Sequence, residues 1–168
     1  MSVSATNPAP SAKDNICVRV QTQDFDLSEE MSLLRATDAG IGAVASFVGI
    51  VRDINDDRDV AAMELEHYPG MTERAIEQIA AQATKRWCIS GATVIHRVGK
   101  LHPLDQIVLV LVTSAHRGDA FAACEFIMDF LKTQAPLWKK ESTPQGSRWV
   151  AARASDDHAA ERWQRPPD

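Results

Sequence analysis

The chain has 168 residues, of which 45% are hydrophobic and 24% charged, and its formal net charge is −5. This length and composition indicate one globular domain with a substantial core. The acidic balance excludes a protein that binds nucleic acid over its whole surface, so a basic function must come from a local cluster. No apolar run approaches the roughly 20 residues of a membrane-spanning helix, which argues against a membrane protein.

The first 15 residues are rich in small residues and proline and lack the apolar stretch of a signal peptide, so they are expected to form a disordered tail. A single domain is predicted over residues 16–163, and residues 164–168 form a second tail. The three cysteines, Cys17, Cys88 and Cys124, are far apart and contain no CxxC pair. This usage argues against a disulfide framework or a zinc site and fits a reducing cytosol.

In the first third of the chain, alternating polarity predicts a strand at residues 16–20. Ser28 is a plausible N-cap for a short helix. Residues 41–51 are small and apolar on both faces and predict a buried strand. That strand ends at Arg52, and the charged residues 53–59 predict a polar loop.

The middle of the chain combines strands and one amphipathic helix. Residues 60–67 alternate cleanly, with Met63 and Leu65 on one face and two glutamates on the other, which predicts a half-buried strand. Residues 72–87 predict a helix. Its apolar stripe consists of Ile76, Ile79, Ala80, Ala83 and Trp87.

Two further strands are predicted at residues 92–98 and 106–113, with a turn over 101–105 between them. A helix then opens at Gly118 and stops before Pro136, which cannot continue it. The predicted buried stripe of this helix consists of Phe121, Cys124, Met128 and Leu131.

Residues 137–141 and 148–152 predict two short strands around a turn at 143–146, and a last helix is expected over residues 155–163. The element order β-α-β-β-α-β-β-α-β-β-α indicates an α+β domain with a mixed or antiparallel sheet.

Two lysines stand on either side of Pro136. Lys132 lies in the last turn of its helix, where a cation is favoured by the helix dipole, and this structural reading alone explains it. Lys139 and Lys140 point to opposite faces of a strand, so one of them can face inward. A catalytic reading requires Lys132 and Lys139 to converge on a pocket, where a lysine could act as an acid, a base or a nucleophile.

A second cationic feature, His116-Arg117, lies between a buried strand and a helix. Backbone amides at the helix start and the Arg117 guanidinium would form an anion site. A turn that simply meets solvent is an equally good explanation. Arg52 ends a buried strand, which favours a place in a cleft. His96-Arg97 lies in mid-strand and is read as structural.

Other chemistry is poorly supported. The five histidines form no HExxH motif, and the chain contains neither GxxxxGK[ST] nor GxGxxG, so no metal site or nucleotide loop is predicted. Trp138 and Trp149 are expected in the core or in an interface.

Six segments in order (GAVASFVGIVRD, LEHYPGM, IHRVGKL, VTSAHRGDAF, FLKTQAPLWKKE and GSRWV) resemble the large, catalytic subunit of molybdopterin synthase. The similarity extends from about Ile16 to Trp163, and no core motif position departs from the family's pattern. It implies a two-layer α/β hammerhead-like fold with a mixed, largely antiparallel sheet. It also implies a cytoplasmic homodimer that carries one small ubiquitin-like sulfur-carrier subunit on each protomer, forming a heterotetramer.

The resemblance further implies a sulfurtransferase of molybdenum cofactor biosynthesis. Such an enzyme converts cyclic pyranopterin monophosphate (precursor Z) to molybdopterin by inserting two dithiolene sulfurs. The sulfur comes from the thiocarboxylated Gly-Gly C-terminus of the carrier, and no metal or other cofactor is needed. Because the pterin phosphate and the thiocarboxylate are both anions, an acidic protein needs a local cationic site to bring them together.

Carried over to this sequence, the family's functional positions are Arg52, His116, Arg117, Lys132 and Lys139, with Phe47, Met128 and Glu141 as pocket neighbours. Lys132 and Lys139 are expected to be catalytic, with Lys132 nearest the carrier's C-terminal carbonyl and Lys139 on the substrate side. The other cations are expected to bind the phosphate and the pterin.

Two alternatives use the same features. A module that binds phosphorylated ligands without catalysis would use the cationic cluster but would need no carrier. A purely structural partner protein would use its apolar strands and tryptophans as an interface, and its lysines would be replaceable.

Overall fold

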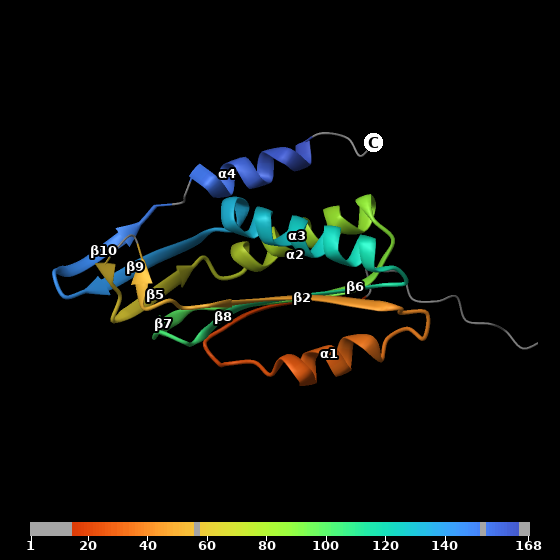
Figure 1. The fold of residues 1–168 in the computed structure, drawn as a ribbon, viewed down its shortest axis with the longest axis horizontal. Coiled ribbons are helices and arrows are strands. Elements are labelled where there is room, and N and C mark those ends of the chain that lie inside the picture. The colour runs from red at the N-terminus through yellow and green to blue at the C-terminus, as the bar shows by residue number, and fades with distance from the viewer. Residues whose placement is uncertain (1–14, 56–57, 152–153, 165–168) are drawn as a thin grey trace, which may run out of the picture.

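The computed structural model describes residues 15–55, 58–151 and 154–164. This part of the chain forms two four-stranded sheets, a short two-stranded ribbon and four α-helices (Figure 1). The predicted α+β class with a mixed, largely antiparallel arrangement of strands is confirmed.

The first sheet has the strand order β1-β6-β8-β2. Its strands are β1 (Ile16–Gln21), β6 (Ile89–Arg97), β8 (Gln106–Ser114) and β2 (Ala43–Ile50). The β1–β6 pair is parallel, and the other two pairs are antiparallel. Helices α2 (Met71–Arg86) and α3 (Arg117–Gln134) cover one face, and α1 (Leu27–Arg35) covers the other (Figure 1).

The central strand β8 is apolar at nearly every position because both of its faces are buried. Val108, Val110 and Val112 belong to the core under α2 and α3. Leu109 and Leu111 belong to a separate cluster under α1. The continuous apolar run in the sequence is therefore explained by a sheet that helices cover on both sides.

The second sheet, of order β10-β9-β5-β7, is entirely antiparallel and extends from one end of the first (Figure 1). Its strands are β10 (Gly146–Val150), β9 (Leu137–Thr143), β5 (Ala62–His67) and β7 (Gly99–Leu101). A third core cluster, which includes Val51, Met63 and Leu65, joins the two sheets.

The predicted faces of β5 are confirmed, since Met63 and Leu65 are buried and the two glutamates are exposed. Trp138 and Trp149 lie outside the core, with exposed fractions of 49% and 57%. Of the two expectations for these tryptophans, the core position is therefore wrong.

Several local predictions need correction. The N-cap of α1 is Asp26, whose carboxylate accepts from the Glu29 backbone N–H at 2.9 Å, so Ser28 lies inside the helix. The predicted loop 53–59 contains the two-residue strands β3 (Ile54–Asn55) and β4 (Arg58–Asp59). A third short strand, β7, precedes the turn predicted at 101–105.

The predicted buried stripe of α3 is wrong at Phe121, whose exposed fraction is 65%. The buried face passes instead through Ala120, Ala123, Cys124 and Ile127. Neighbouring residues of a helix point about 100° apart, so Phe121 turns away from the sheet when Ala120 packs against it.

The last helix packs on α3. Helix α4 (Ala154–Glu161) leads into a 3-10 turn at Arg162–Gln164. Trp163 makes edge-on contacts with Trp87 and Phe126, and its indole N–H donates to Asp129 at 2.7 Å.

Of the predicted tails, 1–15 and 164–168, residues 1–14 and 165–168 lie outside the described residues, and Gln164 ends the 3-10 turn. Asn15, the last residue of the first tail, is described, and its side-chain amide donates to the Ser90 carbonyl. Among the helices of the described segments, none is long and apolar enough to span a membrane.

We predict that two glycine substitutions at the same end of the molecule change stability in opposite directions. A Cβ at Gly42 would lie 2.3 Å from the Ala115 carbonyl oxygen, whereas a Cβ at Gly118 would meet nothing within 4 Å. Gly42→Ala should therefore cost about 2 kcal/mol of unfolding free energy through overpacking. Gly118→Ala, in the first turn of α3, should add up to about 1 kcal/mol through helix propensity. Urea denaturation measures both, and equal stability of Gly42→Ala and wild type would contradict the close packing at this position.

Candidate functional site

Strand β9 places a lysine and a buried carboxylate side by side. Lys139 and Glu141 are two residues apart in an extended strand, so their side chains share one face. Glu141 is only 1% exposed, and the Lys139 side chain is 32% exposed. The Lys139 Nζ lies 2.9 Å from Glu141 Oε1, so the ammonium is held by the carboxylate at the edge of the core.

A third charged residue contacts the same carboxylate. Arg148 lies directly opposite Glu141 on β10, and its Nη2 donates to Glu141 Oε2 at 3.2 Å. Each oxygen of the buried carboxylate therefore contacts a different cation. Arg148 belongs to the GSRWV motif, but no role was predicted for it from the sequence.

Lys132 lies in the last turn of α3, and its side chain is exposed. After α3 the backbone becomes extended at Ala135, and the Pro136 carbonyl accepts from the Thr72 hydroxyl at 2.9 Å. This anchored turn leads directly into β9. Pro136 therefore ends the helix, and the chain runs on into β9, where Lys139 follows Lys132 by seven positions (Figure 1).

The buried His96 lies within electrostatic range of Lys132. Its Nδ1 is 2.8 Å from the Arg97 carbonyl oxygen, and because a carbonyl only accepts, Nδ1 carries the proton. Burial, with a smaller contribution from the charges of Lys132 and His67, lowers the pKa of His96 to about 4, and the hydrogen bond to Arg97 opposes this shift. His96 is therefore neutral at pH 7, in line with the structural role predicted for it.

Arg52 is at the same end of the molecule as the second sheet. It follows Val51, which lies in the cluster that joins the two sheets and accepts a backbone hydrogen bond from Leu104. The Arg52 side chain is exposed. The predicted neighbours differ in exposure, since Met128 is buried one turn before Lys132 and Phe47, on β2, is 41% exposed.

His116 and Arg117 lie at the opposite end of α3. They are exposed at its start, and the His116 backbone N–H donates to the Ser114 hydroxyl at 3.2 Å. Arg117 and Lys132 are 15 positions apart, which corresponds to about 22 Å along a helix.

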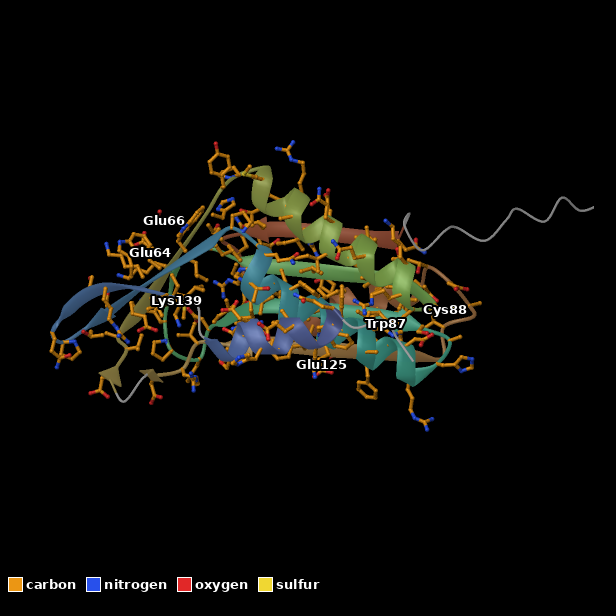
Figure 2. All side chains as sticks on the ribbon, turned by 90° about the horizontal axis from the view of Figure 1, so that it is seen from above. Glu64, Glu66, Trp87, Cys88, Glu125 and Lys139 are labelled. Atoms are coloured by element: carbon orange, nitrogen blue, oxygen red, sulfur yellow. The ribbon has the colours of Figure 1, made fainter. Side chains whose placement is uncertain are left out.

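The separation can be followed in Figure 2, where Lys139 and Cys88 lie at opposite ends of the molecule. The Cys88 backbone N–H contacts Asp119, in the first turn of α3, so Cys88 marks the end that carries His116 and Arg117. The expectation that the strand-end cations and the lysines meet is therefore wrong for a single chain, because a rigid helix holds them apart.

A surface hollow of about 530 Å³ lies elsewhere, between the end of α1 and the start of β2. Its charged lining residues, Arg35 and Asp38, have opposite signs, and none of the predicted site residues lines it. This hollow is therefore separate from the cationic end formed by Arg52, Lys132 and Lys139.

A two-sheet α+β domain with a cationic end on an acidic body is typical of a protein that binds small anions. Comparison with known proteins narrows this class. A profile of the MoaE protein family matches residues 20–134. The chain belongs to this family.

Individual relatives agree with that assignment. The molybdopterin synthase catalytic subunit of Ralstonia nicotianae is 64% identical over 146 residues, covering 87% of this chain and 83% of the relative. The subunit of the same name from Escherichia coli is 54% identical over 144 residues, covering 86% and 95%.

Solved structures show the same similarity. The molybdopterin biosynthesis MoaE protein of Burkholderia ambifaria superposes with a TM-score of 0.78 at 60% identity, covering 89% of this chain and 99% of that one. Molybdopterin synthase from Staphylococcus aureus gives a TM-score of 0.71 at 29% identity, covering 82% and 96%.

We predict that His96 makes stability depend on pH. Its pKa is about 4 in the folded chain and 6.5 as the ordinary value, so between these values the unfolded state binds the proton more tightly. The contribution is fully present above pH 6.5 and is lost as the pH falls toward 4, amounting to about 3 kcal/mol. Denaturant unfolding between pH 7 and 4 should show a shallower loss in His96→Gln than in wild type. His158→Gln, at an exposed position on α4, is the control, and parallel curves for all three proteins would contradict the prediction.

Proposed function

We propose that this chain is the catalytic subunit of a molybdopterin synthase, a sulfurtransferase that converts precursor Z to molybdopterin. Family membership and the names of the relatives support the reaction. The observation that carries the site is the short connection at Pro136, through which α3, with Lys132 in its last turn, leads directly into β9, which bears Lys139. Arg52 adds a further cation at this end.

The cationic end suits the proposed reactants. The pterin carries a phosphate and the sulfur donor is a thiocarboxylate, so both are attracted to Arg52, Lys132 and Lys139. As sulfur replaces oxygen, negative charge develops on oxygen atoms, and ammonium groups can stabilise that charge and supply protons. We assign Lys132 to the carrier's C-terminal carbonyl and Lys139 to the pterin side.

A catalytic subunit of this kind works together with a second subunit. The sulfur comes from a small ubiquitin-like carrier with a thiocarboxylated Gly-Gly C-terminus, one on each protomer of a homodimer, and the chain needs no resident metal or cofactor. The three cysteines are free, which is consistent with a cytoplasmic location.

A second copy of the chain supplies His116 and Arg117 to the site. The outer strand β2 of the first sheet carries the exposed apolar residues Phe47 and Ile50, and the neighbouring α3 exposes Phe121. These residues offer a surface for a two-fold contact. If the two α3 helices lie antiparallel across such an axis, the start of one comes close to the lysine end of the other.

We predict that Lys132→Ala and Lys139→Ala each lower molybdopterin formation by at least about 100-fold, because each removes a donor to charge that develops in the transition state. Purified protein, thiocarboxylated carrier and precursor Z are mixed, and molybdopterin is measured. Lys140→Ala, on the opposite face of β9, is the control and should retain activity. Normal product from either variant would reject the residue assignment, and no product from wild type would reject the function.

We predict that two inactive variants restore activity when their subunits are mixed. Arg117→Ala removes the arginine that one protomer gives to a composite site, and Lys132→Ala removes the lysine that the other protomer gives. In a mixed dimer, one of the two sites therefore keeps both wild-type residues. Random exchange at equal concentrations should restore about a quarter of wild-type activity. Both variants should remain dimers of normal stability in gel filtration and thermal melts. Failure to recover activity in mixtures that have exchanged subunits would mean that the two residues do not meet across the dimer.

A further inference from the structure

The buried carboxylate of Glu141 requires compensation. It lies on the inward face of β9, where its cross-strand neighbour on β5 is Met63 and the neighbour of Lys139 is Leu65, both buried. A carboxylate on such an apolar floor is costly unless cations and hydrogen bonds compensate it. Lys139 and Arg148 each contact one of its oxygens, at 2.9 and 3.2 Å.

Arg148 also changes the field that acts on Lys139. Its guanidinium, on the second oxygen of the carboxylate, offsets part of the negative field of Glu141. The Lys139 ammonium is therefore held less tightly and keeps more of its attraction for an anionic reactant.

We propose that Arg148 is a positioning residue that acts on Lys139 through Glu141. By holding one oxygen of the carboxylate, it fixes the rotamer of Glu141, and this places the Lys139 ammonium at the edge of the site with its charge available. The guanidinium suits this role because it stays charged and binds a carboxylate directionally. The inference deepens the proposed function and rests on the assignment of Lys139 to that reaction.

The neighbouring Lys140 is a natural reference. It lies on the same strand but on the opposite face, 5.6 Å from the centre of the Trp149 ring. It shares the sequence environment of Lys139 without facing the buried carboxylate. A change that affects Lys139 and leaves Lys140 untouched therefore reports on the Glu141–Arg148 group rather than on the hairpin as a whole.

The first test is a double-mutant cycle on the rate of molybdopterin formation at saturating precursor Z and carrier. Arg148→Gln leaves the buried carboxylate with one cation fewer, so its melting temperature should fall. At a temperature where the variant remains folded, the rate should be about 10-fold lower, since a displaced catalytic group is costly. Arg148→Lys should restore most of it. In a Glu141→Gln background, Arg148→Gln should cost less than about 2-fold, because the residue acts through the carboxylate. The same loss in both backgrounds would overturn the proposal.

The second test measures Lys139 without the reaction. Wild type and Arg148→Gln are treated briefly with acetic anhydride, and acetylation of Lys139 and Lys140 is quantified by peptide mass spectrometry. Without Arg148, a larger share of the carboxylate's charge acts on the Lys139 ammonium, so the Lys139-to-Lys140 labelling ratio should fall by about 3-fold or more. An unchanged ratio would overturn the proposal even if activity were lost. A wild-type protein that makes no molybdopterin but shows the expected ratio would reject the proposed function and leave Arg148 as the residue that holds Lys139.

Discussion

The rigidity of α3 decides which cations can act together. Ala120, Ala123 and Ile127 pack this helix against the first sheet, so its two ends cannot approach each other. The lysine end and the His116 end are therefore two separate surfaces of one chain. A small ligand that contacts both must lie between two copies, which gives the expected homodimer a chemical reason beyond added stability.

The acidic composition and the cationic end are compatible because electrostatic fields act locally. A net charge of −5 spread over the surface is screened within about 10 Å at moderate salt, whereas a cluster at a junction of two sheets acts at contact distance. The buried Glu141 fits the same logic. It weakens the positive field slightly, yet in return it fixes a flexible lysine at one place, and precise placement matters more for a reacting group than total charge.

The fold was largely predictable from periodicity. The apolar run of β8 and the alternation of β5 identified a doubly covered strand and a half-covered one, because burial alone sets those patterns. The errors arose where a prediction had to identify one particular residue within a pattern. Asp26 rather than Ser28 caps α1, because its carboxylate accepts from the Glu29 backbone N–H. Phe121 lies one position from the buried face, which the packing of Ala120 decides.

The candidate site was predictable only where its residues are close together in the sequence. Lys132 and Lys139 lie at one end of the molecule because β9 follows α3 after the short turn at Pro136. His116 lies at the other end because α3 is long, and the length of α3 can also be estimated from the sequence. The predicted turn at residues 143–146 already implies a hairpin register in which Glu141 opposes Arg148. Hairpin register can thus identify a cross-strand ion pair such as Glu141–Arg148 from the sequence alone.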